Sequence, residues 1–352
     1  MVHDLRQHSS PAHGDDRSTA YYADKLGTLQ DLCGTSAVSL EPGFLVVRGH
    51  RYPIVGDVIV LLEPSQYSPR LAHRLGSTGV SDGPPPMAFA EDIQYTFGEE
   101  WTAFPEILPE HEREFYQYFD LLDLSALKEW RVCDLGCGIG RWSFFVSKLC
   151  REVVLVDFSD AIFVARRNLA AASNTLFFMA DLTRLAFRDD FADLVVCLGV
   201  LHHLPTPALD EVRALRRWSR RLLVYLYYAL DNQPRHFRWL LWFVDGMRMM
   251  LSGRVRSPAW RGTLTWLLAS GLYLPLVGMG RLLRPVTWSR YVPLYDTYAG
   301  KSLRRIRQDV YDRFFTRIEQ RHSRQEILAL TDAFSRVLVS GHSPYWHFLC
   351  EC

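Results

Sequence analysis

Residues 131–142 read RVCDLGCGIGRW, with three glycines, Gly136, Gly138 and Gly140, behind an aspartate, Asp134. An apolar run followed by alternating glycines is typical of a strand that turns sharply into a helix. Any side chain at these glycine positions would hold a ligand away from the backbone. The spacing lacks the third-glycine offset that a pyrophosphate site favours. An acid aimed into this turn would repel a pyrophosphate and attract an ammonium group.

From this stretch onward, continuous apolar runs alternate with amphipathic segments of helical period. Such alternation indicates an α/β fold with a parallel sheet whose two faces are covered by helices. A last helix and two more strands are expected near the end of the chain. The runs that predict strands are RVCDLG (131–136), EVVLVDFS (152–159), TLFFMADL (175–182), ADLVVCLGVL (192–201), RRLLVYLYY (220–228), SRVLVSG (335–341) and SPYWHFLCE (343–351).

Hydrophobic content, net charge and cysteine count limit the classes of protein to which this chain can belong. The 352 residues are 48% hydrophobic, enough to bury a sizeable core, and carry a net charge of +1. A near-neutral chain gives no electrostatic reason to expect nucleic acid, although the sum would hide a local basic patch. The seven cysteines are odd in number and form no CxxC pair, which fits a reducing cytoplasm. We therefore expect a cytoplasmic protein.

The chain divides by composition into unequal parts. The first residues lack an apolar signal region and are expected to form a disordered tail. A Ser/Gly/Pro-rich stretch containing Pro84–Pro86 is expected to be a linker. The expected organisation is a tail (1–20), a small module (21–63), the linker (64–90), an α/β domain (91–230 and 323–352) and an insertion rich in Trp, Leu, Met and Arg (231–322).

Polar residues end successive predicted strands, at the edge where open α/β sheets bind ligands. S-adenosylmethionine (SAM) offers an ammonium, a ribose diol and an adenine. Asp134 suits the amino group, Asp157 suits the ribose hydroxyls as a two-oxygen acceptor, and Phe158 can stack on adenine. Asp181 can accept from the adenine amino group. The alternatives are that Asp134 only caps the glycine turn and that Asp181 only caps a loop.

The motifs VCDLGCGIG, VVLVDFS and LAFRDDFADLVVCLGVLHHL occur in this order, and together they resemble the class I SAM-dependent methyltransferases. The resemblance covers 131–228, and 323–352 as the closing helix and strand pair. It implies a Rossmann-like seven-stranded sheet with an antiparallel last strand, and SAM as methyl donor. The residues it places at the cofactor are Asp134, Gly136, Gly138, Gly140, Asp157, Phe158, Asp181, Leu182 and Leu198.

A second resemblance lies in the small module. RYPIVGDVIVLLEP, residues 51–64, is similar to the end of zinc-ribbon-like modules that accompany or activate some methyltransferases. Cysteine pairs precede this stretch in those modules, whereas only Cys33 precedes it here. A tetrahedral metal site cannot be assembled from one cysteine, so no metal is expected. The module would serve as packing or as a lid.

The acceptor is expected beyond the fourth predicted strand, where GVLHHL places His202 and His203. Either could be a general base or an orienting partner, because histidine exchanges protons near neutral pH. The alternative is that the histidine only braces its loop. FGEEW, residues 97–101, is expected to fold over the SAM pocket, or else to be an aromatic core contact. The further acceptor candidates are Trp101, Tyr227, Tyr228, Asp231, Arg321 and His322.

The insertion is expected to shape the acceptor pocket with helices. Residues 263–280 carry no charge over 18 positions, near the lower length of a membrane span. Pro275 and the flanking arginines make a span less attractive than a hydrophobic lid or an interfacial segment. Peripheral membrane contact through 236–283 therefore remains an open alternative.

Three functions fit these observations. The first is SAM-dependent methyl transfer to a small, partly apolar or lipid-linked acceptor at oxygen, as in natural-product or glycan-type biosynthesis. The second is methylation of an RNA base, which the neutral charge and the apolar insertion disfavour. The third is a non-catalytic SAM-binding scaffold. The absence of an N/D-PP-Y/F motif after the fourth predicted strand removes one reason to expect an amino-group acceptor in DNA or protein.

Overall fold

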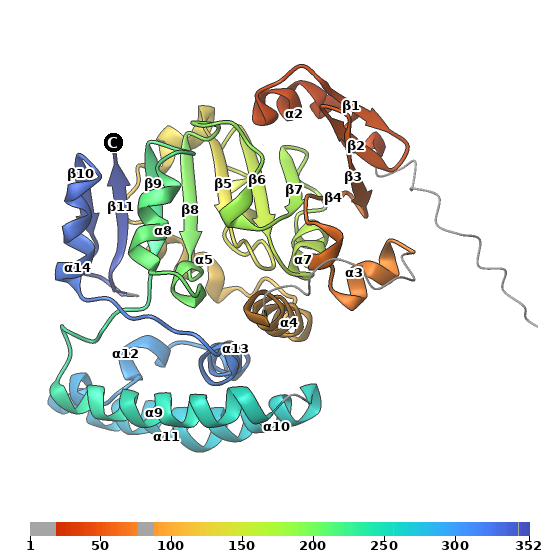
Figure 1. The fold of residues 1–352 in the computed structure, drawn as a ribbon. Helices are drawn as coiled ribbons and strands as arrows, with labels where there is room; N and C mark the ends of the chain where they lie inside the picture. Colours follow the sequence, from red (N-terminus) through yellow and green to blue (C-terminus); the bar gives the residue numbers. More distant parts are fainter. Residues whose placement is uncertain (1–18, 77–87, 256, 344) are drawn as a thin grey trace, which may run out of the picture.

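The computed structural model describes residues 19–76, 88–255, 257–343 and 345–352. The expected tail lies outside this part of the chain, apart from its last two residues, and so does the run Pro84–Pro86. The centre of the molecule is a twisted sheet with helices on both faces (Figure 1). A layer of helices covers the edge at which the parallel strands end.

Seven strands of the sheet come from residues 131–351, in the order β7-β6-β5-β8-β9-β11-β10. β5 to β9 pair in parallel, whereas β11 runs antiparallel to both of its neighbours, as expected. Their bounds are β5 (Arg131–Leu135), β6 (Glu152–Asp157), β7 (Thr175–Met179), β8 (Leu194–Leu198), β9 (Arg221–Tyr225), β10 (Arg336–Val339) and β11 (His347–Glu351).

The strands are buried on both faces because their apolar residues are continuous rather than alternating. In β6, Val153 and Leu155 pack into one core, and Val154 and Val156 pack into the other. The helices that cover the faces are α5 (Glu110–Tyr118), α6 (Ser143–Val146), α7 (Ala161–Asn168), α8 (Ala208–Leu215) and α14 (Arg324–Leu328). Short 3-10 turns connect them at η3 (Leu124–Glu129), η4 (Leu182–Arg184), η5 (Leu201–His203) and η9 (Ala329–Asp332).

The N-terminal module corrects the expectation of a sheet limited to seven strands. Its strand β4 pairs in parallel with β7, with Ile59 opposite Phe178, so one sheet of eleven strands runs through both parts. The apolar stretch FLVVRGHRYPIVGDVIVLLEP, residues 44–64, reads as two short strands around a turn, but the structure forms three strands there. The elements of the module are η1 (Ala23–Lys25), α2 (Leu26–Cys33), β1 (Val38–Glu41), β2 (Phe44–Val47), β3 (His50–Val55) and β4 (Val58–Val60).

The expected linker is also partly structured. It begins with η2 (Pro64–Gln66) and α3 (Pro69–Arg74), which starts at a Ser68 cap that accepts from the Leu71 amide. The following helix, α4 (Ala88–Ala103), crosses the carboxyl ends of the strands (Figure 1). Proline at the first helical position explains both short helices, because its fixed φ suits that position.

Residues 231–322 form a cap of helices over the carboxyl ends of the parallel strands (Figure 1). Inside the cap, Tyr273, Tyr298 and Phe314 build a separate apolar core. Tyr228 and His322 form an isolated bridge where the cap leaves and rejoins the sheet. The elements are α9 (Arg235–Arg254), α10 (Pro258–Leu268), the π-helical η6 (Ala269–Tyr273), α11 (Leu274–Leu283), η7 (Arg284–Val286), η8 (Trp288–Tyr291), α12 (Tyr295–Tyr298) and α13 (Leu303–Phe315).

One stretch of the cap has the length and composition of a membrane span. Pro258–Val286 is helical over 29 residues, with a mean hydropathy of 1.3 in its most apolar window, of which 22% is buried in the protein. Its inner face contributes Ala269, Tyr273 and Val277 to the cap core. In this fold the stretch is therefore a surface helix of the cap.

Candidate functional site

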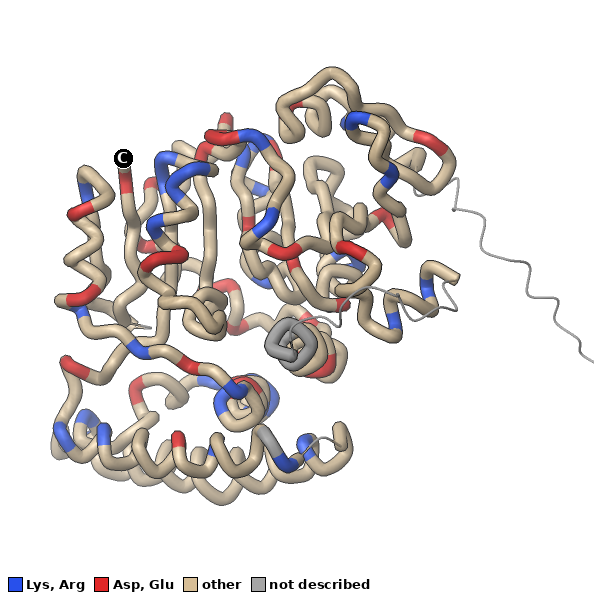
Figure 2. Tube along the Cα trace, in the orientation of Figure 1, with Lys and Arg blue, Asp and Glu red and all other residues tan. Residues whose placement is uncertain are grey.

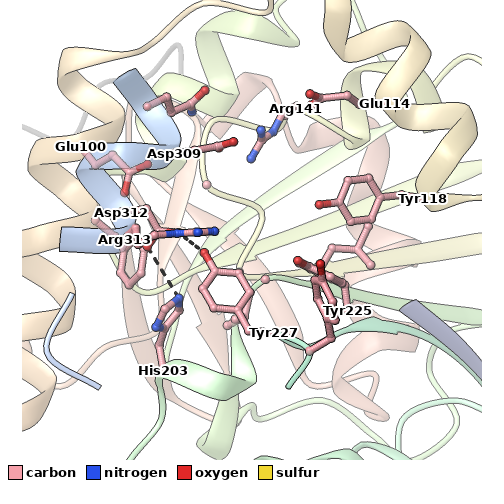
Figure 3. A pocket seen from close by; sticks show the side chains of 18 of the residues that line it. Glu100, Glu114, Tyr118, Arg141, His203, Tyr225, Tyr227, Asp309, Asp312 and Arg313 are labelled. Carbon is pink, nitrogen blue, oxygen red and sulfur yellow. Dashed lines mark hydrogen bonds and ion pairs between the residues drawn. The ribbon is translucent and has the colours of Figure 1, made fainter. Parts of the chain in front are cut away.

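A cavity of about 790 Å³ lies between the sheet and the cap (Figure 3). Its floor includes the glycine turn and the residues at or just beyond the carboxyl ends of β6, β7, β8 and β9. Its walls come from α4 and α5, and its roof from α9 and α13. The cavity therefore connects the site expected for SAM with the region expected for an acceptor.

The three glycines have different surroundings. Gly136 and Gly138 line the cavity, and Gly136 has a φ of 70°. A Cβ at Gly136 would lie 2.4 Å from Cγ2 of Val200, so a larger residue could not fit. Gly140 does not line the cavity; a Cβ there would lie 2.6 Å from Leu169, the residue that ends α7. Gly136 and Gly138 shape the ligand surface, whereas Gly140 permits close packing of the turn on a helix.

Asp157 fits a ribose hydroxyl, but through one oxygen rather than two. It lines the cavity and is 8% exposed. Its Oδ1 accepts from the amide and the hydroxyl of Ser159, at 2.8 and 2.7 Å, and its Oδ2 accepts from the Gly138 amide at 2.8 Å. A carboxylate oxygen has two lone pairs, so Oδ2 can accept one more donor. Burial raises the pKa of Asp157, and these hydrogen bonds oppose the rise.

Asp134 lies beneath the turn, outside the lining of the cavity, and is 3% exposed. Its Oδ2 accepts from the Ser143 hydroxyl at 2.6 Å. Burial raises the pKa of this carboxyl to about 7. The placement matches the alternative of a residue that braces the turn, and it gives Asp134 no surface in the cavity with which to meet an amino group.

The remaining expected cofactor residues, Phe158, Asp181, Leu182 and Leu198, all line the cavity. The Oδ1 atom of Asp181 accepts from the amide and the hydroxyl of Thr183, at 2.9 and 2.7 Å, so this residue caps η4 as well. The two expectations for Asp181, a loop cap and an adenine partner, are compatible with this placement.

The structure separates the two histidines. His203 lines the cavity, and its Nδ1 lies 2.8 Å from the carbonyl oxygen of Ile318. Donation from Nδ1 to that carbonyl leaves a lone pair on Nε2, which is 3.7 Å from Oδ1 of Asp312. His202 is fully buried, stacks on Tyr227 and does not line the cavity. Burial holds the pKa of His202 well below its ordinary value, so His202 is a neutral core residue.

The candidate acceptor-binding residues fall into those that line the cavity and those that do not. Trp101, Tyr227, Tyr228 and Arg321 line the cavity. Asp231 and His322 do not. Asp231 accepts from Nε1 of Trp346 at 2.6 Å and from the Arg324 amide at 2.9 Å, so it ties the start of the cap to the end of the chain.

The largest group of functional residues missed in the sequence lies on α13. Arg305, Asp309, Asp312 and Arg313 all line the cavity. Asp309, Asp312 and Arg313 point inward from this helix (Figure 3). The spacings of four and three residues between Arg305, Asp309 and Asp312 follow the helical period, and Arg313 adjoins Asp312. A periodic charged stripe inside an apolar insertion was the signal that could have identified them, although such a stripe usually faces solvent.

Charged residues of α5 and of the loop before α13 form ion pairs with the charged residues of α13. Nε of Arg305 lies 3.2 Å from Glu114, and Nζ of Lys301 lies 2.9 Å from the same carboxylate. Burial opposes ionisation of Glu114, yet these two cations lower its pKa to about 2. Glu100 is the opposite case, because burial and the charge of Asp312 raise its pKa well above the ordinary value. The cavity wall thus holds Glu114, whose carboxylate form is favoured, and Glu100, whose protonated form is favoured.

Residues 132–223 match a protein family described as a methyltransferase domain. The rRNA methyltransferase RlmD of Pseudomonas savastanoi pv. phaseolicola is 35% identical over 29% of this chain and 24% of its own length. The ubiquinone biosynthesis O-methyltransferase of Hahella chejuensis is 26% identical over 50% of this chain and 70% of its own length. The chain thus spans about a quarter of the first RNA-methylating relatives it matches.

Among solved structures, a phosphoethanolamine N-methyltransferase of Haemonchus contortus, in complex with phosphoethanolamine and S-adenosylhomocysteine, matches with a TM-score of 0.36 and 18% identity. The match covers 43% of this chain and 35% of that chain. The family match supports a methyltransferase domain of class I over residues 132–223, a family that uses SAM as its cofactor.

Proposed function

We propose that this chain transfers the methyl group of SAM to a hydroxyl oxygen of a small, partly apolar or lipid-linked acceptor. The observation that carries the proposal is one continuous cavity that joins Gly138 and Asp157 to His203 under the cap. Apolar side chains of α9, among them Leu240 and Val244, form its roof beside the polar face of α13. A pocket with both kinds of wall suits an amphiphilic acceptor.

When bound, SAM supplies an electrophilic methyl carbon. The free lone pair of Asp157 Oδ2 would hold a ribose hydroxyl, and Phe158 would lie against the adenine. Nε2 of His203 would take the proton of the acceptor hydroxyl as the oxygen–carbon bond forms and the carbon–sulfur bond breaks. Asp312 would stabilise the imidazolium that results, and S-adenosylhomocysteine would leave with the sulfur electron pair.

Glu100, the carboxylic acid in the wall, is not assigned to the proton transfer. Burial and the charge of Asp312 raise its pKa well above the ordinary value, which favours the protonated acid, and a protonated carboxyl is a poor acceptor for a further proton. His203 is the lining residue with both a free lone pair and a neighbouring carboxylate to balance the charge it would gain.

RNA methylation is the second candidate, favoured by relatives whose names assign them RNA substrates. These relatives match over 30% of this chain or less, and the matches are about as long as the methyltransferase domain alone. An RNA base would have to leave its stack and pass the cap to reach the cavity. The enclosed, partly apolar roof therefore supports a small acceptor better than a polynucleotide.

The test uses the full chain and SAM labelled in its methyl group. Calorimetry should first show binding of SAM and of S-adenosylhomocysteine. Label should then enter a component of a lipid or polar-metabolite extract, and mass spectrometry should locate the methyl group on oxygen. Label that enters only RNA would support the second candidate, and SAM binding with no transfer to any extract would support the scaffold function instead.

A further inference from the structure

Arg313 is a cation inside the cavity whose neighbouring acids are engaged elsewhere. Its side chain points from α13 toward the centre of the cavity (Figure 3). Within the described part of the chain, its Nε has no hydrogen-bond partner. Asp312 accepts from the hydroxyl of Tyr227, and Glu319 forms an ion pair with Arg321. The guanidinium of Arg313 is therefore available to a ligand.

The surroundings of Arg313 suit an oxyanion. Tyr227, Tyr273 and Tyr298 line the cavity and lie close enough to Arg313 to interact electrostatically with its guanidinium. A buried charge without a partner is costly, and a carboxylate or phosphate oxygen would relieve that cost with charge-assisted hydrogen bonds. Tyrosine hydroxyls add neutral donors around the same space.

We infer that Arg313 binds an anionic group of the acceptor, a carboxylate or a phosphate. This inference rests on the proposed function and names the substrate class: a hydroxyl compound that also carries an acidic group. Asp312, next in sequence to Arg313, is the residue that contacts His203. The anion would therefore be held beside the base that takes the hydroxyl proton.

The carboxylate of SAM is the competing anion, and Arg141 is placed for it. Arg141 directly follows the glycine turn and lies over the rings of Trp101 and Trp142, at 5.3 and 4.7 Å. Its Nε and Nη1 are buried without a partner among the described residues. In this assignment Arg141 serves the cofactor and Arg313 serves the acceptor.

The test needs no knowledge of the acceptor. The full chain, saturated with S-adenosylhomocysteine, is titrated with inorganic phosphate and with acetate, and binding is followed by calorimetry and thermal shift. Arg313→Met should weaken binding of the preferred anion about tenfold or more, whereas Arg304→Met, an exposed arginine of the same helix, should not. Comparison of phosphate with acetate distinguishes the two anion sources.

Two results would overturn the assignment. One is a wild-type protein that binds neither anion. The other is an Arg313→Met protein with weakened affinity for S-adenosylhomocysteine, which would assign Arg313 to the cofactor. Because anion binding is read without methyl transfer, absence of transferase activity would count against the proposed function and leave this test intact.

An independent observation concerns the outer surface of the cap. Sixteen large hydrophobic residues are exposed in the described part of the chain, and all but Tyr95 and Tyr116 lie between residues 239 and 291. They recur at helical spacing along the outside of α9 and of α10–α11 and continue into η7 and η8. This outer face consists of Trp239, Trp242, Phe243, Met249, Met250, Trp260, Trp266, Leu267, Leu274, Met279, Leu282, Val286, Trp288 and Tyr291.

The outer face lies on the side of the cap away from the sheet. α13 contacts α9, α10 and η6 and lies between them and the strands (Figure 1). The opposite side of α9 lines the cavity through Phe237, Leu240 and Val244. A helix that is apolar on both sides needs a second apolar partner, because a monomer rarely exposes more than about 300–600 Å² of contiguous apolar surface.

Charge identifies that partner. Residues 235–291 contain nine arginines and one acid, Asp245, whereas the rest of the chain has 31 basic and 38 acidic residues. The net charge of +1 therefore hides a strongly basic cap. The arginines appear toward the two ends of the cap helices (Figure 2). Six of these arginines are exposed and form no ion pair with an acid among the described residues. They are Arg235, Arg238, Arg254, Arg281, Arg284 and Arg290.

We propose that the outer face docks on an anionic lipid bilayer, with α9 and α10–α11 lying in the plane of the interface. Tryptophan and arginine are the residues that interfacial helices use, the first at the headgroup level and the second against anionic lipid. Spanning is disfavoured because Tyr273 and Val277, on the inner side of the long stretch, pack in the cap core. Docking would bring the cavity roof next to the membrane.

The test is flotation of the full chain with phosphatidylcholine vesicles, with and without about a third phosphatidylglycerol. Binding should require the anionic lipid and fall with salt. Trp239→Ser with Trp242→Ser should weaken it at least about tenfold, and Arg281→Gln with Arg284→Gln should weaken it in the anionic vesicles. Tyr116→Ser, which removes an exposed aromatic of α5, is the matched control.

Failure of the wild-type protein to float with either vesicle would overturn the proposal. So would a concentration-dependent dimer that disappears in the tryptophan variant, because the face would then join two copies of the chain. Displacement from vesicles by RNA at stoichiometric amounts, with RNA binding lost in the tryptophan variant, would assign the face to a polynucleotide.

Discussion

Asp312 on α13 lies 3.7 Å from His203 on η5, through its Oδ1 and the Nε2 of the histidine. The two residues come from different parts of the fold, one from the cap and one from the loop after β8. The same carboxylate accepts from the hydroxyl of Tyr227. A proton acceptor assembled across the cap and the sheet requires both parts to be in place before it can act.

Replacement of this histidine should affect turnover rather than cofactor binding. In His203→Gln, kcat should fall about 100-fold or more, the usual contribution of a positioned general base. Asp312→Asn should lower kcat less, because the base remains. S-adenosylhomocysteine affinity should stay unchanged in both, as should all parameters in His73→Gln, a surface control on α3. A His203→Gln enzyme with full kcat would remove His203 from the proton transfer.

Removal of the carboxylate expected to accept from the ribose should weaken binding of the cofactor. Asp157→Ala should cost about 1–3 kcal/mol of SAM binding, because it leaves the buried Gly138 and Ser159 donors without their acceptor as well as removing the ribose partner. Calorimetry with SAM measures the loss. Asp24→Ala, at a side chain that is 80% exposed, is the control. Equal affinities in both variants would contradict the assignment of this site to SAM.

The carboxyl of Asp134 should make stability depend on pH. Burial raises its pKa from 3.8 to about 7, so between these values the folded chain holds a proton that the unfolded chain has released. This group's contribution should therefore decrease as pH rises through that window, by about 1.4 kcal/mol per unit, and then level off. Denaturant unfolding of wild type and Asp134→Asn gives the difference. A difference that is constant from pH 4 to about 7 would argue against the raised pKa.

The glycine turn should not tolerate a side chain at its first position. Gly136→Ala combines a positive φ with a Cβ 2.4 Å from Val200, and it should destabilise the fold by about 1–3 kcal/mol. Gly246→Ala, in open space on α9, should instead stabilise by about 0.5–1 kcal/mol. Thermal unfolding compares the two. A destabilised Gly246→Ala protein would show that the loss at Gly136 is not specific to the turn.

Local rules in the sequence identified the strands and turns around the cofactor, because each depends on neighbours in the chain. The run VVLVD is buried on both faces, and Gly136 needs its positive φ whatever lies farther away. Residue type also indicated Asp157 at a strand end. Ser159 and Gly138 already occupy several lone pairs of the Asp157 carboxylate, and these contacts depend on the three-dimensional fold. The prediction from sequence that both oxygens bind the ribose was therefore too generous.

Features that depend on distant contacts could not be predicted in this way. Nothing in GVLHHL distinguishes His202 from His203, because the difference is that Tyr227 covers one ring and Asp312 approaches the other. The charged face of α13 was missed because its partners, among them Glu114, precede it by many residues. The pairing of β4 with β7 could not be predicted for the same reason, because the two strands are far apart in the sequence.

That joining has a consequence for synthesis on the ribosome. The partner of Ile59 is Phe178, so more than a hundred residues must follow β4 out of the exit tunnel before its outer edge can be paired. Until then the nascent chain carries a short, fully apolar strand with open hydrogen-bonding groups. The module cannot mature by itself first and wait for the rest, because its last strand acquires its neighbour only when β7 has been translated. Vectorial folding of this protein is therefore postponed, and its early intermediates are the species most exposed to chaperones and to aggregation.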